Sequence, residues 1–472
     1  MSRFVALSIL FICIRSLPAQ PGALAKLDVV ATEPKGAPVT DLSAKDIRVH
    51  ENGVVCPLVF FRFAGGKHEM AQLAPNEFAN HPGPPVTVIL LDRWNEEEMT
   101  MVSAWQDVNA AIGRMESVDR VYIYFLGNRG NLVPVRPLPG VETDLRTPEA
   151  TPAAALISKL SDAVRSLNGL RDKANVDPME RADKTLQALH IVSAMASIAG
   201  PKNLVWVTHG FPIQLLNLTQ QWVDYSGPLL GVAQLAVKSQ VAIYTVDQSA
   251  EGAGADPAGL SRQTLELLSA QTGGRWFASG RTSDALTAIA NDAHGTYRLA
   301  FFPPPENRKS KDQKLHIDSP RKGVRFLARV GFSGDEASPD DDEIVSDIFR
   351  RQSHSPFEAT EIGLRVVRVP KPSGLQLEIH VDPADVFLEH AGDTYRGGLA
   401  VEIAQYRDGS FESAQPVLRR ELTLTRAELE SAMKDGIVIP GDVDVLDRVG
   451  QVRVMVLDLG LRGLGSVTVP VK

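Results

Sequence analysis

Cysteine is scarce in this sequence, with only Cys13 and Cys56 among 472 residues. Cys13 lies in an N-terminal segment that we expect to be removed, so the mature chain would hold one cysteine and could form no intramolecular disulfide. Large hydrophobic cores must then supply the stability. Cys56 has apolar neighbours and no basic residue close by in sequence, which favours a buried core thiol over a reactive one.

Long apolar runs are confined to the N-terminus. Arg3 precedes a largely apolar run from Phe4 to Ile14, and Leu17-Pro18-Ala19 before Gln20 forms a plausible cleavage site. This order is typical of a secretory signal peptide, here residues 1–20. No later stretch approaches the roughly 18 unbroken apolar residues that a membrane helix needs. We therefore expect an exported protein, periplasmic or extracellular, with no membrane span after signal removal.

Short catalytic signatures are also missing. The sequence contains no G-x-S-x-G, no H-E-x-x-H, no G-x-x-x-x-G-K-[ST] and no recognisable cysteine-based dyad. The 49 basic and 57 acidic residues give a net charge of −8, which disfavours a nucleic-acid partner. None of these signatures supports an enzyme, and one reading is an exported binding protein without a cofactor. An exported hydrolase-like enzyme with dispersed catalytic residues is the alternative.

The stretch from Val86 to Glu98 organises the rest of the chain. Six apolar or β-branched residues end there at one carboxylate, Asp92, and a helical pattern follows. A short, fully apolar run is typical of a strand buried on both faces, as in a parallel sheet covered by helices. Ligands of such sheets bind outside the carboxyl ends of the strands, which makes Asp92 a candidate site residue. The alternative is that Asp92 only caps the next helix or closes a turn.

Beyond this strand, strand and helix patterns alternate, which predicts an α/β, Rossmann-like, doubly wound sheet in residues 85–333. The expected strands cover residues 120–126, 203–208, 241–246 and 275–278, and the expected helices cover 153–167, 179–199, 222–237 and 261–271. A dinucleotide site is set aside, because Asp92-Arg93-Trp94-Asn95 stands where G-x-G-x-x-G would be required.

The flanking segments are predicted to be rich in β-structure. Residues 21–84 are expected to form a small N-terminal β module and a linker, with Asn52-Gly53 as a hairpin turn whose central positions need positive φ. Residues 334–357 are expected to be an acidic linker that includes a short helix. Residues 358–472 show the alternation of a C-terminal β-sandwich, in which Thr425 and Glu428 have the spacing of a helix capping box.

Several short motifs follow one another in a definite order between Leu27 and Phe332. They are Pro38 to Leu42, Asp46 to Gly53, Val88 to Asp92 with Asn95, Gly200 to Thr208 with Gly210-Phe211-Pro212, Thr272 to Arg275, Tyr297 to Leu299, and Arg329 to Phe332. Their order and spacing resemble the von Willebrand factor type A domain, and more narrowly the VWFA-related domain family of secreted acidobacterial proteins. The resemblance implies a Rossmann-like sheet preceded by a small β domain.

Broader relatives of this family bind a divalent cation and a partner's carboxylate at the top of the sheet. Their ligands are a D-x-S-x-S motif, a threonine and an aspartate on three loops, a set that suits Mg²⁺. Here Asp92 and Thr185 match, whereas Trp94 and Glu96 replace the serines and His209 replaces the third-loop aspartate. Trp94 offers no metal-binding atom. The resemblance therefore predicts a degenerate site without metal, and Mg²⁺ or Ca²⁺ at Asp92 is the less favoured alternative.

We accordingly predict no catalytic residues and a surface that binds a protein partner through these loops. The predicted binding residues are Asp92, Trp94, Asn95, Thr185, His209 and Phe211. A partly exposed tryptophan is a frequent interface anchor, but packing of Trp94 under the loop is an equal alternative. A lone loop histidine such as His209 is more often solvated or capping than a transition-metal ligand. The sequence does not identify the partner.

Overall fold

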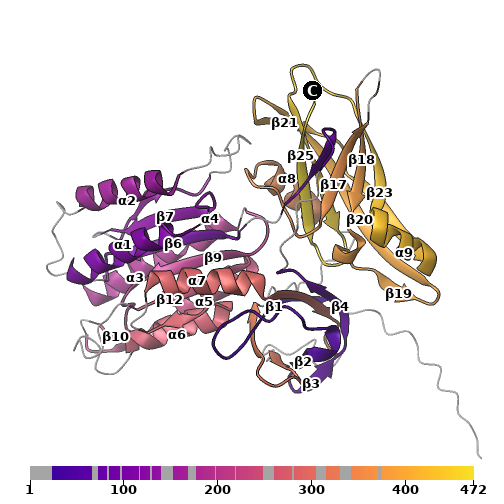
Figure 1. Ribbon diagram of the computed structural model, residues 1–472. Helices are drawn as coiled ribbons and strands as arrows, with labels where there is room; N and C mark the ends of the chain where they lie inside the picture. Colours follow the sequence, from indigo (N-terminus) through magenta and orange to yellow (C-terminus); the bar gives the residue numbers. More distant parts are fainter. Residues whose placement is uncertain are drawn as a thin grey trace, which may run out of the picture.

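The computed structural model describes residues 24–65, 73–81, 84–95, 98–115, 117–127, 130–139, 152–167, 177–196, 198–217, 219–247, 260–278, 281–304, 315–329, 342–369, 371 and 374–471. These residues form three parts: an α/β part, a β module and a sandwich, which Figure 1 shows in sequence colours. The predicted signal peptide, residues 1–20, lies outside the described residues.

The α/β part is built on a six-stranded sheet in the order β13-β12-β9-β6-β7-β8. Its strands are β6 (Val86–Asp92), β7 (Val121–Leu126), β8 (Leu132–Arg136), β9 (Lys202–Val207), β12 (Val241–Val246) and β13 (Trp276–Phe277). Every neighbouring pair is parallel except β7 and β8. Counted along the chain, the spatial order is 3-2-1-4-5-6, which places the topological switch point between β6 and β9.

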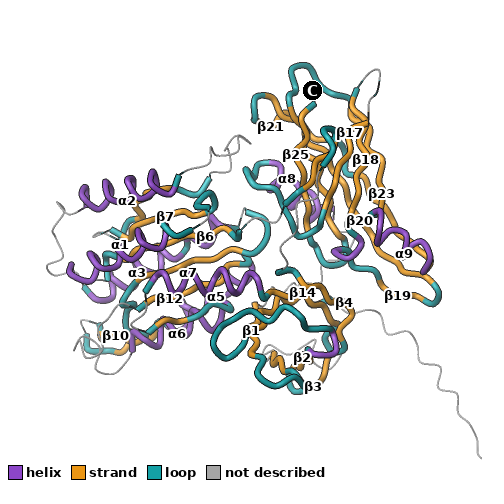
Figure 2. Tube along the Cα trace, viewed as in Figure 1, coloured by secondary structure: helices purple, strands orange, loops and turns teal. Residues whose placement is uncertain are grey.

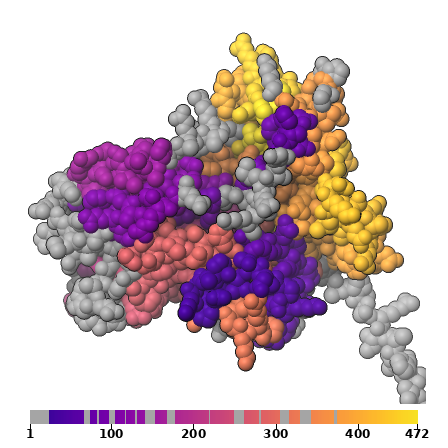
Figure 3. All heavy atoms as spheres, viewed as in Figure 1, coloured from indigo at the N-terminus to yellow at the C-terminus, as the bar shows by residue number. Residues whose placement is uncertain are grey.

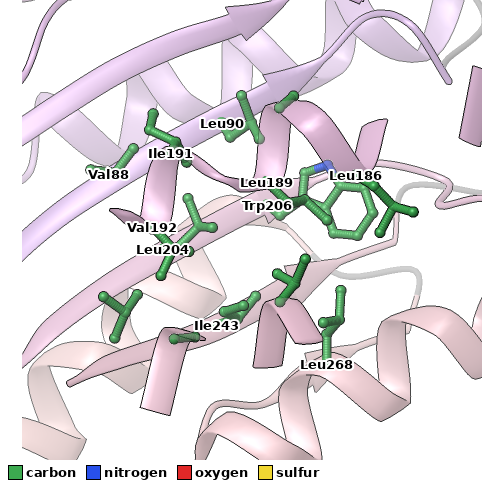
Figure 4. Packing of buried hydrophobic residues seen from close by; sticks show 14 of the residues in the cluster. Val88, Leu90, Leu186, Leu189, Ile191, Val192, Leu204, Trp206, Ile243 and Leu268 are labelled. Atoms are coloured by element: carbon green, nitrogen blue, oxygen red, sulfur yellow. The ribbon is translucent and has the colours of Figure 1, made fainter. Parts of the chain in front are cut away.

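Helices cover both faces of this sheet, as the tube view shows (Figure 2). On one face the core contains residues of α1 (Glu98–Ile112), α2 (Ala153–Leu167) and α7 (Thr282–His294). On the other face it contains residues of α3 (Pro178–Leu189), α4 (Ile191–Met195), α5 (Ser226–Lys238) and α6 (Leu260–Thr272). Figure 4 shows Trp206 of β9 packed between the sheet and Leu186 and Leu189 of α3. Each such aliphatic side chain contributes about 1.5–3 kcal/mol when buried, so the two cores supply a large stabilising term.

The β module draws its strands from two distant segments. One sheet has the order β16-β1-β14-β4 and the other β15-β2-β3. The strands are β1 (Ala25–Thr32), β2 (Arg48–Glu51), β3 (Val54–Cys56), β4 (Leu58–Phe63), β14 (Thr296–Phe301), β15 (Leu315–Asp318) and β16 (Arg325–Arg329), with a short 3-10 helix, η1 (Ala44–Asp46). The turn between β2 and β3 has φ of 50° at Asn52 and 83° at Gly53, as predicted.

This pairing corrects the predicted division at residues 84 and 85. The strands β14, β15 and β16 had been assigned to the α/β part, yet β14 and β16 pair with β1 and β15 pairs with β2. Alternation reveals that a segment is a strand, but it does not reveal which distant strand completes its sheet. Leu27 and Val29 of β1 and Leu299 of β14 share one core, which needs both segments.

The sandwich also includes one strand, β5, from outside the predicted boundary. One sheet has the order β23-β18-β17-β5, and in the other β20 pairs with β19, β24, β21 and β22, while β25 pairs with β24. The strands are β5 (Glu77–Ala79), β17 (Leu364–Val369), β18 (Leu375–Val381), β19 (Glu389–Ala391), β20 (Thr394–Arg407), β21 (Ser410–Ala414), β22 (Leu418–Thr425), β23 (Ile437–Val443), β24 (Gln451–Asp458) and β25 (Leu464–Pro470), with η3 (Pro383–Asp385). The helix α9 (Arg426–Asp435) begins with the predicted capping box of Thr425 and Glu428.

Two segments predicted as linkers therefore have structural roles. Strand β5, from the first linker, pairs with β17. Much of the second linker forms α8 (Asp342–Ser353), whose Val345 and Phe349 pack with Met455 and Leu457 on the outer face of the sandwich. An amphipathic helix explains this docking, because its apolar stripe must be covered.

Ion pairs and a hydrogen bond join the β module to the sandwich. Lys26 Nζ lies 2.7 Å from Glu361 Oε1, and Arg298 Nη1 donates to the Glu361 carbonyl oxygen at 2.9 Å. Arg62 contacts Asp382 and Asp385 of the sandwich at 3.0 Å each. The space-filling view shows the indigo β module packed directly against the orange and yellow sandwich (Figure 3). The β module and the sandwich are therefore interlocked by ion pairs, while β5 and the strands β14 to β16 come from segments on either side of the α/β part.

Cleavage between the α/β part and the sandwich is expected to leave the two halves associated. A specific protease site inserted after Asp340 would cut the chain once, but β5 and the Lys26–Glu361 and Arg62–Asp385 pairs would still hold both fragments together. Native size-exclusion chromatography should show one peak, and a denaturing gel should show two bands. Elution of the C-terminal fragment by itself at native pH would contradict the interlocked arrangement.

Candidate functional site

The candidate site lies at the carboxyl end of β6, where the sheet reverses its winding. Asp92 ends this strand and is fully buried. Its Oδ2 accepts hydrogen bonds from Trp206 Nε1 at 3.1 Å and Thr208 Oγ1 at 2.7 Å, both on or just after β9. The carboxylate thus ties the two central strands together at the switch point.

Asn95 donates the other two hydrogen bonds to this carboxylate. Its backbone N–H donates to Asp92 Oδ1 at 3.0 Å, and its side-chain Nδ2 donates to Asp92 Oδ2 at 2.7 Å. The same Nδ2 lies 2.9 Å from Thr185 Oγ1, which in turn donates to the Arg181 carbonyl oxygen at 2.8 Å. The amide of Asn95 therefore bridges Asp92 and Thr185, two residues of the predicted site that the fold brings together.

Burial raises the pKa of the Asp92 carboxyl above its ordinary value, although the hydrogen bonds from Asn95, Thr208 and Trp206 oppose the shift. A carboxylate needs such donors because an unpaired buried charge is costly. With four donors around it, Asp92 is a satisfied internal group. The sequence alternative in which Asp92 closes a turn fits these contacts, because it binds the Asn95 backbone three residues ahead.

The residues present do not fit a divalent cation. The amide nitrogen of Asn95 occupies the position between Asp92 and Thr185, where a cation would need oxygen ligands. In the described part of the chain, no group of three or more His, Cys, Asp or Glu side chains is arranged to hold a metal ion. Glu96, which replaces one expected ligand, lies outside the described residues. Metal independence stays a prediction and has a direct test.

Millimolar Mg²⁺ or Ca²⁺ is expected to leave the melting temperature unchanged relative to EDTA. A ligand at 100 times its dissociation constant stabilises a protein by about 2.7 kcal/mol, so a cation site of useful affinity would be visible in thermal unfolding. Wild type and Asn95→Ala should be compared, since Asn95→Ala removes the amide that fills the space beside Asp92. A cation-dependent rise of several degrees in wild type would contradict the prediction.

Trp94 does not have the exposure that was expected of an interface anchor. Its side chain is only 4% exposed, and its Nε1 donates to the Arg181 carbonyl oxygen at 3.1 Å. The Arg181 guanidinium lies 5.9 Å from the centre of the indole ring. The expectation of a partly exposed Trp94 is wrong, because the indole packs under the loop, where its apolar area and its N–H are both satisfied.

His209 and Phe211 lie in the loop after β9 but differ in exposure. His209 is partly exposed, and its Nδ1 lies 3.5 Å from Asp247 Oδ1. Phe211 is 2% exposed and packs edge-on against Tyr225, with ring centres 5.7 Å apart. Between them, Gly210 has a φ of 70°, which L side chains rarely adopt, and a Cβ there would lie 3.0 Å from Leu265 Cδ2. Phe211 therefore anchors the loop to the core and cannot form part of a contact surface.

An exposed apolar pair that the sequence analysis missed lies just beyond this loop. Strands β10 (Gln214–Leu216) and β11 (Trp222–Asp224) form a hairpin in which Leu216 faces Trp222. Leu216 is 41% exposed and Trp222 is 64% exposed. The hairpin lies at the end of the α/β part farthest from the sandwich (Figure 1). It belongs to the same carboxyl edge of the sheet as Asp92 and His209.

The sequence prediction placed Trp222 in a helix, which is wrong, because α5 begins only at Ser226. Two signals could have located this start. Asp224 Oδ1 accepts from the Ser226 N–H at 2.7 Å, and Pro228 falls in the first turn, where proline is favoured. Leu215 and Val223 point into the core while their neighbours point outward, which is the period of a strand.

Comparison with protein-family models and with curated proteins gives no match to this chain. Within the described residues, no helix is long and apolar enough to cross a membrane. The fold resemblance and the role of the site accordingly depend on the residues and contacts given above.

Proposed function

We propose that this is an exported, non-enzymatic protein-binding protein. Its α/β part, a von Willebrand factor A-type domain by resemblance, docks a protein partner through the loops at the carboxyl ends of the central sheet. The partner contact needs no metal. Residues 1–20 act as the signal peptide that directs the chain to the periplasm or the exterior, and the β module and the sandwich orient the binding edge.

The observation that carries this proposal is the exposed pair Leu216 and Trp222 at that edge. A tryptophan with 64% of its surface in solvent is a large apolar side chain left without an internal partner. The cross-strand position of Leu216 gives the indole a rigid apolar neighbour, and Tyr, Trp and Arg dominate the energetics of protein interfaces. Leu215 and Val223, on the opposite face of the hairpin, pack in the same core as Phe211.

Substituting Trp222 by alanine is expected to weaken partner capture about 30-fold, the effect of a hot spot of about 2 kcal/mol. The melting temperature should barely change, because the side chain is exposed. The measurement is quantitative recovery of bound proteins from a cell-envelope extract containing EDTA. Met433→Ala is the matched control, since Met433 is a comparably exposed apolar residue on α9. Equal recovery by Trp222→Ala and wild type would contradict the proposal.

A further inference from the structure

Carboxylates surround the base of the β10–β11 hairpin. Asp224 ends β11 and is exposed. Asp183 of α3 accepts a hydrogen bond from the Tyr225 hydroxyl at 3.1 Å. Asp177 caps the start of α3 by accepting from the Met179 N–H at 3.1 Å, and the Tyr225 hydroxyl lies 3.4 Å from the Met179 carbonyl oxygen. Asp183 thus contacts the Tyr225 hydroxyl, Asp177 caps the same helix, and Asp224 precedes Tyr225 at the end of β11, the strand that carries Trp222.

The negative charge of these carboxylates, which form an acidic rim beside the hairpin, acts on Tyr225. Burial, together with the nearby carboxylates of Asp183 and Asp177, raises the pKa of its phenol to about 12. Both carboxylates are therefore close enough to act electrostatically on the tyrosine oxygen. Glu180, in the first turn of α3, is exposed and adds a fourth negative charge to the same helix end.

The basic residues of α3 lie on its other side. The Arg181 guanidinium lies over the Trp94 ring, 5.9 Å from its centre. The stem of Lys184 packs so closely on Gly130 that a Cβ there would lie 2.4 Å from it. Neither contact is directed toward Tyr225, which Asp183 meets from its own side of the helix. The hairpin thus presents an apolar pair with an acidic rim.

We propose that the partner segment is basic. It lays an apolar side chain between Leu216 and Trp222 and directs lysine or arginine side chains toward Asp177, Asp183 and Asp224. This inference rests on the proposed function and specifies the chemistry of its partner. The net charge of −8 acts in the same sense and disfavours a second copy of this chain as the occupant. Rim charges of this kind act mainly on the association rate and on its salt dependence.

The test uses variants that remove charge but keep the helix caps. Replacing Asp177, Asp183 and Asp224 together by asparagine deletes three charges, and asparagine caps helices as well as aspartate does. The matched control replaces three exposed acids of the sandwich by amides, Asp393→Asn, Asp408→Asn and Glu421→Gln, which changes the net charge equally. The probes are two fluorescent peptides of equal length, one alternating leucine and lysine, the other alternating leucine and glutamate.

The lysine peptide is expected to bind wild type and the sandwich control equally, and the triple asparagine variant about ten-fold more weakly at low salt. Added salt should reduce that difference. Trp222→Ala should bind the lysine peptide about 30-fold more weakly than wild type does. Equal affinity for the two peptides, equal affinity of the asparagine variant, or no binding of the lysine peptide at millimolar concentration would overturn the basic partner.

A failure of the basic-partner inference can be distinguished from a failure of the proposed function. If Trp222→Ala abolishes capture of envelope proteins while the asparagine variant captures them as wild type does, the binding edge stands and the partner is not basic. If the hairpin is instead covered by a second copy, sedimentation velocity will show a wild-type dimer that Trp222→Ala dissociates, and the inference fails.

Discussion

Replacing Asp92 by alanine is expected to lower the free energy of unfolding by about 3–5 kcal/mol, the scale of removing one partner from a buried charged network. The change leaves Trp206 Nε1, Thr208 Oγ1 and both donors of Asn95 without their acceptor at the centre of the sheet. Each unsatisfied buried donor costs about 1–3 kcal/mol. Urea unfolding followed by tryptophan fluorescence measures this loss.

Asp162→Ala is the control for Asp92→Ala, because Asp162 is an exposed aspartate on α2 with one surface ion pair. Its loss should change stability by less than about 0.5 kcal/mol. A loss of less than about 1 kcal/mol for Asp92→Ala would mean that the carboxylate is not the common acceptor of these donors.

Replacing Glu361 by glutamine is expected to cost about 3–5 kcal/mol at neutral pH, because Lys26 then loses its counter-charge and Arg298 keeps only Asp28. Burial opposes ionisation of Glu361, but the charges of Lys26 and Arg298 outweigh it and lower the pKa of this carboxyl from 4.5 to about 2. The folded-state pKa is depressed, so the stabilisation is complete above pH 4.5 and is lost as the pH falls toward 2.

The pH dependence of the stability difference between wild type and Glu361→Gln shows whether the ion pairs of Glu361 cause it. A shift of this size corresponds to about 3 kcal/mol, so the difference in stability between wild type and Glu361→Gln should be large at pH 7 and should shrink between pH 4.5 and 2. Denaturant unfolding at several pH values measures it. Glu430→Gln, which removes an exposed pair with Arg426, should show little difference at any pH. A difference for Glu361→Gln that does not change with pH would contradict the ion-pair account.

Local patterns in the sequence located most of the secondary structure. The apolar run before Asp92 is β6, and Asn52-Gly53 has the backbone of a type I′ turn. Both features depend on residues that are adjacent in sequence. The pairing of β1 with β14 and of β5 with β17 joins segments more than 250 residues apart. Hydrophobic alternation contains no information about such partners, so the predicted boundary at residues 84 and 85 separates strands that share one sheet.

The candidate site, too, could be predicted from the sequence only in part. The sequence located Asp92, Asn95 and Thr185, and the fold brings them together. It could not reveal that Trp94 is buried and Trp222 exposed, because both tryptophans lie in loops or short strands with mixed neighbours. Exposure is decided by packing against α3 for Trp94 and by the hairpin geometry for Trp222.

Site-specific cross-linking from position 222 tests the central claim most directly. A photoreactive phenylalanine analogue at position 222, and in a control at position 433, is introduced into the exported protein and irradiated in intact cells in the presence of EDTA. The account predicts a protein adduct from position 222 that is absent from position 433. Adducts from position 433 alone, or adducts from position 222 that disappear when EDTA is present, would contradict a metal-independent protein-binding edge.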